Sequence, residues 1–263
     1  MKYKFGILGL GKMGSSILSG IINSKLYYKN DILLFDVNEE IKVKFQSDGY
    51  NFSTSEQELF ESCNYVLLAI KPQMFYILES LDLNKLNLVI ISIAAGKTIN
   101  DLRKIFGKQK FIRVMPNTPA LIQNGSTAIA RDFSVDDATF NDVKKIFESI
   151  GIVEEISEDK MNEIIPVNGS MPAYLYYFVE AFIEEAVAMG LDYEVSKKLA
   201  CEAIIGSCNM ILKANKSIAE LIKDVCSPGG ATLAGLKVLE EEKFKDIIKE
   251  CYKKCVQRAY ELS

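Results

Sequence analysis

The 263-residue sequence predicts an α/β fold, with a Rossmann-like parallel sheet in its first half and only helices in its second. Short runs rich in Val, Ile and Leu alternate with amphipathic segments as far as residue 157. This alternation is typical of a parallel sheet covered by helices on both faces. Beyond that point the periodicity is helical throughout. We therefore expect one domain over 1–157 and a second, all-helical domain over 158–263.

The elements of the first domain are predicted in chain order. A helix is expected at 13–24, and a second helix is expected to begin at a capping box formed by Ser134 and Asp137 and to run to Ile150. Apolar runs predict strands at Tyr3–Leu8, Ile32–Asp36, Tyr65–Ile70, Leu88–Ile93, Phe111–Met115 and Gly151–Ile156.

The most apolar helix of the second domain is expected over Pro172–Met189. Ser170 is suited to cap its first turn, where a proline is tolerated. Its residues are apolar on nearly every face, and such a helix needs protein on all sides. The remaining helices are too few to cover it. We therefore expect a second copy of the chain to complete the burial, making the helical region a dimerisation domain.

Composition excludes several classes of function. The chain has 31 basic and 35 acidic side chains, a net charge of −4, which argues against a nucleic-acid partner. It has no histidine, which excludes Ser–His triads, Cys–His pairs and His-anchored zinc sites. Its six cysteines are scattered without a Cys-x-x-Cys pair, so we expect free thiols and no metal.

Localisation is predicted from the first residues and from the apolar helix. Met1–Lys4 leads directly into a strand, leaving no room for a signal peptide. Glu180, Glu184 and Glu185 would be costly inside a bilayer, so no membrane contact is expected. These features indicate a cytoplasmic protein.

A glycine-rich segment follows the first strand. Gly9–Gly14 reads Gly-Leu-Gly-Lys-Met-Gly and joins a strand to a helix, which is the context of a Rossmann-like dinucleotide site. Asp36 lies at the end of the second strand, where a carboxylate binds ribose hydroxyls and repels a 2′-phosphate. NADH is therefore favoured, although Lys42 and Lys44 could fold back and keep NADPH as the alternative.

Three later loops leave strand ends at the same edge of the sheet. They are Ala69–Pro72, Ile93–Gly96 and Met115–Pro119, and their small residues and prolines would let a flat nicotinamide lie against rigid backbone. Lys71 is expected either to contact the cofactor or to be an ordinary solvated lysine.

One further motif lies in the helical half. Ser227–Thr232 reads Ser-Pro-Gly-Gly-Ala-Thr and opens a helix, so its N–H groups could hold a carboxylate or a phosphate. A plain turn between two helices would have the same spacing.

Taken in order, Gly9–Gly14, Ala69–Pro72, Met115–Pro119, Pro172–Tyr174 and Ser227–Thr232 resemble the motifs of the pyrroline-5-carboxylate reductase family. The resemblance spans essentially the whole chain. It implies NAD(P)H-dependent reduction of (S)-1-pyrroline-5-carboxylate to L-proline, the last step of proline synthesis. It also implies a Rossmann domain followed by a helical dimerisation domain, with five dimers forming a decamer as the larger assembly.

The resemblance also implies site residues. For the catalytic role we expect Thr232, because a hydroxyl is sufficient to hydrogen-bond the imine nitrogen. The substrate would be held by Ser227, Gly229, Gly230, Ala231, Thr232 and Glu158. The cofactor would be held by Leu8, Gly9, Leu10, Gly11, Lys12, Met13, Asp36, Ala69, Ile70, Lys71, Pro72, Ile93, Ala94 and Ala95.

The chain departs from the family pattern at Asn168 and Met171, since the family reads Ser-Gly-Ser-Gly-Pro-Ala-Tyr across 168–174. Reduction of a C=N bond needs orientation and a hydrogen bond rather than a strong base, so the absence of histidine is no obstacle. Three alternatives remain: a reductase of another cyclic imine, a 3-hydroxyacid enzyme using Lys71 as its acid, and an NAD(H)-sensing protein without turnover.

Overall fold

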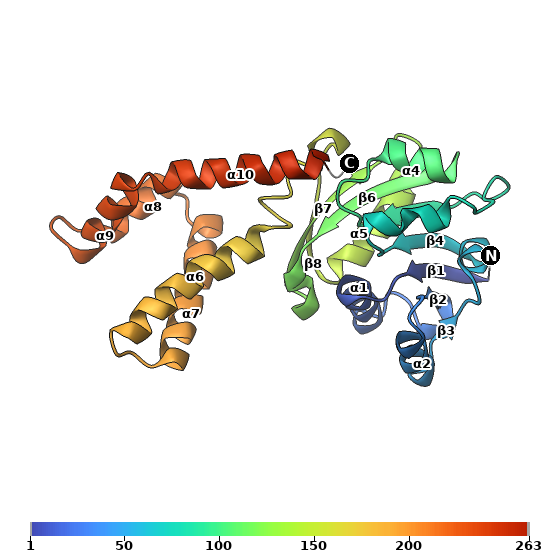
Figure 1. Ribbon diagram of the computed structural model, residues 1–263, viewed down its shortest axis with the longest axis horizontal. Helices are drawn as coiled ribbons and strands as arrows, with labels where there is room; N and C mark the ends of the chain where they lie inside the picture. Colours follow the sequence, from blue (N-terminus) through green and yellow to red (C-terminus); the bar gives the residue numbers. More distant parts are fainter. Residues whose placement is uncertain (1, 262–263) are drawn as a thin grey trace. The chain divides into compact units, whose positions relative to one another are not determined.

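The computed structural model describes residues 2–261, which divide into two compact units (Figure 1). The first unit is formed by the described residues up to Pro172 and from Cys255 onward. The second unit is Ala173–Lys254. The functional domain boundary at residue 157 stays a prediction.

An eight-stranded sheet forms the centre of the first unit, in the order β3-β2-β1-β4-β5-β6-β7-β8. All neighbours pair in parallel except β6 and β7, which are antiparallel. The strands are β1 (Tyr3–Leu8), β2 (Ile32–Phe35), β3 (Asn51–Phe52), β4 (Cys63–Leu68), β5 (Val89–Ser92), β6 (Lys110–Pro116), β7 (Gly125–Arg131) and β8 (Gly151–Glu155). The chain winds outward in both directions from β1 and β4. The carboxyl ends of these two strands are therefore the topological switch point, where ligands bind in open α/β sheets.

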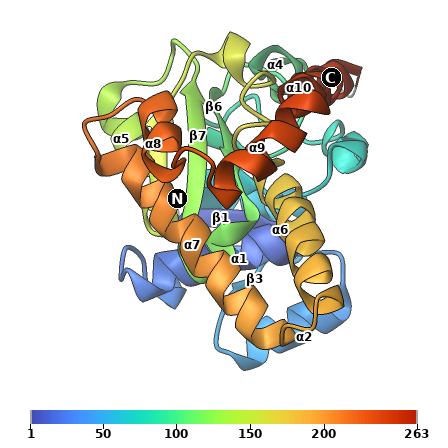
Figure 2. The ribbon, with the colours of Figure 1, turned by 90° about the vertical axis from the view of Figure 1, so that its left-hand side faces the viewer.

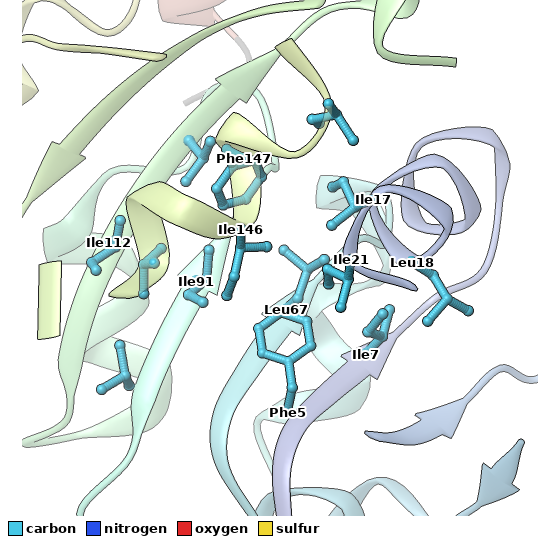
Figure 3. Close-up of a cluster of buried hydrophobic side chains, with 14 of the residues drawn as sticks. Phe5, Ile7, Ile17, Leu18, Ile21, Leu67, Ile91, Ile112, Ile146 and Phe147 are labelled. Atoms are coloured by element: carbon cyan, nitrogen blue, oxygen red, sulfur yellow. The ribbon is translucent and has the colours of Figure 1, made fainter. Parts of the chain in front are cut away.

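Helices cover both faces of this sheet. On one face, α1 (Lys12–Asn23) and α5 (Asp137–Glu148) direct side chains such as Ile17, Ile21 and Phe147 toward the strands (Figure 3). On the other face lie α3 (Glu56–Ser62), the 3-10 helix η2 (Pro72–Leu78) and α4 (Ile99–Phe106). The remaining elements of this unit are α2 (Glu39–Ser47) and the 3-10 helices η1 (Lys29–Asp31), η3 (Thr118–Ile122) and η4 (Glu158–Lys160). The predicted fold class, a Rossmann-like sheet between helical layers, is confirmed, and among the described strands the antiparallel pairing of β6 with β7 is the one departure from the parallel sheet predicted.

The start of α5 differs from the prediction. Its cap is Asp136, whose carboxylate accepts a hydrogen bond from the Thr139 N–H at 2.8 Å. The Ser134 hydroxyl instead donates to Asp132 at 3.0 Å. The capping box predicted at Ser134 is therefore wrong, because an acid two residues later is better placed to accept from the first turn.

The described residues of the second unit contain helices and no strand. They form most of α6 (Met171–Ala188), then α7 (Tyr193–Lys213), α8 (Ile218–Val225), α9 (Ala231–Glu241) and the first part of α10 (Phe244–Glu261). Figure 2 shows α6 and α7 joined by a short turn at 189–192. Phe178 packs against Phe182 and Phe244, with ring centroids 4.9 and 6.3 Å apart. The expectation of an all-helical second half is confirmed.

Candidate functional site

The loops expected to bind a cofactor meet at one edge of the sheet. The Gly9 N–H donates to the Phe35 carbonyl at 2.9 Å, and the Ala69 N–H donates to the Leu8 carbonyl at 2.8 Å. The Ile93 N–H in turn donates to the Leu68 carbonyl at 3.2 Å. These hydrogen bonds continue the ladders past the ends of β1, β2, β4 and β5. The loops after β1, β4 and β5 therefore lie together at the carboxyl ends of these strands.

The glycine-rich loop is packed tightly on one side and open on the other. A side-chain carbon on Gly14 would overlap the carbonyl oxygen of Gly9, so only glycine fits there. Gly11 has nothing within 4 Å of where its Cβ would be. The helix α1 begins at Lys12 with no side-chain cap and no acid in its first turn. Its first N–H groups are therefore available to an anion.

Asp36 is fixed by both of its carboxylate oxygens. Oδ2 accepts from the Leu10 N–H at 2.7 Å, and Oδ1 accepts from the Asn38 N–H at 2.9 Å. The carboxylate therefore ties the end of β2 to the glycine-rich loop, a link that the sequence analysis missed. A carboxylate has lone pairs beyond these two bonds, so it can still accept hydrogen bonds from a ribose.

Lys42 and Lys44, the two lysines that could have favoured NADPH, both contact other side chains. Lys42 pairs with Glu39, its Nζ lying 3.0 Å from a carboxylate oxygen. The Nζ of Lys44 lies 5.8 Å from the ring centroid of Phe45. Glu39 and Glu40 occupy the first turn of α2. The chain directly after Asp36 is therefore acidic.

The loops after β4 and β5 differ in what fixes their backbone: a proline in the first and a hydrogen bond in the second. Lys71 is exposed and precedes η2, whose first residue is Pro72. Ala94 is buried, and its N–H donates to the Ser92 hydroxyl at 3.2 Å. The remaining predicted contacts, Ile70, Ile93 and Ala95, lie in the same two loops, where Ala95 is exposed and the other two are half-buried.

A buried amide network, also missed by the sequence analysis, lies beside the end of β6. Asn117 donates to the Ser126 hydroxyl at 3.0 Å and accepts from the Ser126 N–H at 2.9 Å. The Asn168 side chain donates to the Met115 carbonyl at 2.5 Å and accepts from the Ser126 hydroxyl. Asn168 departs from the family pattern, and that departure was the signal in the sequence. The network anchors the segment before α6 to the end of β6.

Glu158, expected to contact the substrate, has partners within the first unit. Its Oε1 accepts from Arg113 Nη1 at 2.6 Å and from the Ile99 N–H at 3.2 Å. The other expected substrate residues lie at 227–232, in the second unit. A substrate role for Glu158 stays a prediction.

The loop at 227–232 opens α9 within the second unit. Gly229 has a φ of +72°, a conformation that disfavours any side chain. Gly230 caps α9 without a side-chain hydrogen bond, and the first turn of the helix contains no acid. The leading N–H groups of α9, including that of Thr232, are therefore available to an anion.

Thr232 also lines a largely apolar groove of about 370 Å³ within the second unit. Its lining includes Ser207, Met210, Ile211, Ile218, Leu221, Ile222, Asp224, Val225, Cys226 and Leu236. A small ligand placed there would contact mostly apolar side chains, with Thr232, Ser207 and Asp224 among the polar residues of the lining.

Large apolar side chains are exposed along the second unit. Tyr177 is 78% exposed, Leu212 81% and Leu199 66%. Ile183 is the single buried apolar side chain among residues 173–254. Exposed apolar surface of this extent marks an interaction surface.

Neither a side-chain cluster suited to a metal nor a membrane-spanning helix is found among the described residues. No cluster of three or more acidic or thiol side chains in residues 2–261 is placed to hold a metal. None of the helices described is both long and apolar enough to cross a bilayer.

Comparisons with known proteins agree along the whole chain. Residues 158–262 match the family model described as pyrroline-5-carboxylate reductase dimerisation. Residues 4–96 match the model described as NADP oxidoreductase, coenzyme F420-dependent. The chain is 35% identical to the pyrroline-5-carboxylate reductase of Escherichia coli, covering 100% of this chain and 99% of that protein. It is 30% identical to the enzyme of Pisum sativum, covering 99% and 96%.

Solved structures give the same result. A pyrroline carboxylate reductase from Plasmodium falciparum, with NADP bound, matches with a TM-score of 0.90 at 30% identity, covering 100% of this chain and 99% of that one. A prephenate dehydrogenase from A. aeolicus matches with a TM-score of 0.53 at 18% identity, covering 100% and 99%, and shares the fold alone.

Proposed function

The chain belongs to the pyrroline-5-carboxylate reductase family, and from that premise we propose that it reduces (S)-1-pyrroline-5-carboxylate to L-proline, the last step of proline biosynthesis. One observation carries the proposal: the helices α1 and α9 both begin without a side-chain cap, one in each unit. The reaction needs two such anion sites, one for the cofactor pyrophosphate and one for the substrate carboxylate.

NADH is the proposed cofactor, held by the loops at 8–13, 69–72 and 93–95. Gly11 leaves open space in front of α1, and a pyrophosphate fits there because no side chain intervenes. The Asp36 carboxylate would accept from the ribose hydroxyls. The acids that follow it, and the engagement of Lys42 by Glu39, disfavour the extra phosphate of NADPH.

The substrate carboxylate would be held by the N–H groups at the start of α9, with Ser227, Gly229 and Gly230 shaping the turn. The Thr232 hydroxyl lies in the first turn of the same helix and would hydrogen-bond the ring nitrogen. Bound nicotinamide supplies the hydride to the C=N carbon. Because an imine can arrive already protonated, no side chain has to act as a strong acid, and Thr232 only orients the ring.

The assembly proposed is a cytoplasmic homodimer, with a decamer of five dimers as the larger form. The exposed apolar side chains of α6 and α7 support an interface between copies, because a lone helical unit would leave them in water. The partners are otherwise small molecules, with neither nucleic acid nor membrane involved.

Turnover is the first test of this function. Purified protein should oxidise NADH, followed at 340 nm, when pyrroline-5-carboxylate is added without metal. NADPH and other cyclic imines serve as comparisons. Tight NADH binding without turnover on any imine would contradict the proposal and favour a sensor.

Thr232→Val is the second test, because it keeps the shape of the side chain and removes its hydroxyl. We expect kcat/KM for the imine to fall by on the order of 10²-fold, while the Kd for NADH changes less than about threefold. Ser196→Ala, which removes a hydroxyl from α7 outside this groove, is the control and should change neither by more than about twofold. An unchanged kcat/KM in Thr232→Val would remove this hydroxyl from the mechanism.

A further inference from the structure

A buried charge lies on the strand β6, outside the loops assigned to the cofactor. Arg113 is on β6 and only 3% of its side chain is exposed. Its Nη1 donates to Glu158 at 2.6 Å, and its Nη2 has no hydrogen-bond partner among the described residues. A buried guanidinium needs a carboxylate, because its charge is otherwise uncompensated. Glu158 therefore holds Arg113 in place.

The same carboxylate oxygen reaches a second element. Glu158 Oε1 accepts from the Ile99 N–H at 3.2 Å, and Ile99 is the first residue of α4. Thr98 and Asp101 form a capping box at this helix start, which orders the rest of the first turn. Glu158 thus connects β6 to the N-terminus of α4, where a negative charge is stabilised.

The helix start is also one end of a cofactor loop. The loop at 93–98 joins β5 to α4, and its first half is fixed by the hydrogen bond from the Ala94 N–H to the Ser92 hydroxyl. Ser92 pairs with Arg113 in the register of β5 and β6. The two ends of the loop are therefore fixed to the same place on β6: one by strand pairing, the other through Glu158 and Arg113.

We propose that Glu158 and Arg113 are positioning residues that set the shape of the loop at 93–98 for the cofactor, and that Glu158 is not a ligand of the substrate. This inference rests on the proposed function, in which that loop borders the nicotinamide. A displacement of about 1 Å in such a loop is enough to weaken binding and hydride transfer together.

Glu158→Gln tests the proposal because the amide can still accept from Ile99 but no longer carries the charge that holds Arg113. We expect the Kd for NADH, measured by fluorescence titration without imine, to rise about tenfold, and kcat to fall. The KM for the imine should change less than about twofold. Glu155→Gln is the matched control, since Glu155 is itself 45% exposed and pairs with Arg131 at 3.1 Å, and it should change none of these values.

Arg113→Lys is the second variant, because it keeps a positive charge opposite Glu158 while losing the planar fork of donors. Its Kd for NADH should lie between those of the wild type and Glu158→Gln. A raised imine KM with an unchanged NADH Kd would overturn the proposal and make Glu158 a substrate ligand. A lowered melting temperature with both constants unchanged would overturn it as well. Because NADH binding is measured without turnover, these outcomes stay separate from a failure of the wild type to reduce the imine.

Discussion

The two units of this chain bury their apolar side chains to very different extents. The first unit has two large clusters of fully buried side chains, one on each face of its sheet. The second unit has a single buried apolar side chain, Ile183, in 82 residues from Ala173 to Lys254. The first unit therefore has a core of its own, whereas the second lacks the burial that normally offsets conformational entropy. A helical unit of this size can be rich in Leu, Ile and Tyr and still need the surface of another protein chain to bury them.

The largest effect is expected on dimer affinity, when a charge is placed on the exposed apolar face of the helical unit. Tyr177→Asp places a charge on α6 at a side chain that is 78% exposed in the single chain. If the helical unit pairs with a second copy, burying that carboxylate without a partner should weaken the dimer by at least about 100-fold. Sedimentation velocity across a dilution series measures this.

Val43→Asp is the control for that variant. Val43 is 58% exposed on α2 in the first unit, and a charge there should leave the assembly unchanged. Equal dimer affinity in both variants would show that the helical unit does not depend on this face.

A second prediction separates function from folding in the first unit. Gly11→Ala adds a methyl group in open space, so the melting temperature should stay within about 2 °C of the wild type. The same methyl group would obstruct the pyrophosphate, and the Kd for NADH should rise by on the order of 10-fold to 100-fold. Gly14→Ala is the contrast, because its methyl group overlaps the Gly9 carbonyl and should lower the melting temperature itself. Calorimetry and NADH titration of both variants decide the matter.

A third prediction concerns cofactor choice. Asp36→Ser should raise kcat/KM for NADPH relative to NADH by about tenfold, since removal of like-charge repulsion of about 1.4 kcal/mol corresponds to one decade. Activity with both cofactors should fall somewhat, because the variant also loses an acceptor for the Leu10 N–H. A wild type that already prefers NADPH would contradict the assignment of Asp36 to the ribose.

The smallest effect is a pH dependence within the first unit. Partial burial alone would raise the pKa of Asp101, but hydrogen bonds from Thr98 and Lys104 outweigh it and lower the pKa to about 2. A lowered pKa stabilises the folded state above about pH 4, and the stabilisation is lost as the pH falls toward 2. After allowance for solvent screening, we expect about 1 kcal/mol.

Denaturant unfolding at pH 7 and at pH 2.5 should therefore show a penalty for Asp101→Asn at the higher pH that shrinks at the lower. Glu148→Gln, at an exposed carboxylate that pairs with Lys144, should show little penalty at either pH. A penalty of equal size at both values of pH would attribute it to lost packing instead of charge.

Local patterns were enough to predict most of the fold. The glycine-rich loop and Asp36 stand at fixed distances along the chain, so the strand, turn and helix around them could be inferred from spacing. The antiparallel strand β7 was not predicted, because Gly125–Arg131 has small and polar residues in place of a continuous apolar run. Its position depends on pairing with β6, which no local pattern encodes.

The site was predicted less completely than the fold, and for the same reason. Arg113 and Glu158 are 45 residues apart in sequence, and Asn117 and Asn168 are 51 apart. Such partners are chosen by the register of the sheet and by the path of the chain across it. The hydrogen bond from the Leu10 N–H to Asp36 was missed for a different reason. The sequence motif predicts that Asp36 binds a ribose, but it does not predict which protein groups Asp36 also contacts.

The chain leaves and rejoins the first unit at one place. The Ser170 hydroxyl, just before α6, lies 3.5 Å from Cys255 Sγ, and the Tyr260 hydroxyl donates to Glu163 at 2.9 Å. Ala259, on the same stretch of α10, is buried. In topological terms the helical unit is an insertion between two segments of the first unit, which contact each other through Ser170 and Cys255. A protein engineer could excise it and join residue 172 to residue 255 with a very short linker, since linkers need only span the gap between their ends. The product would be a free-standing nucleotide-binding module, and a different helical module could be grafted at the same junction.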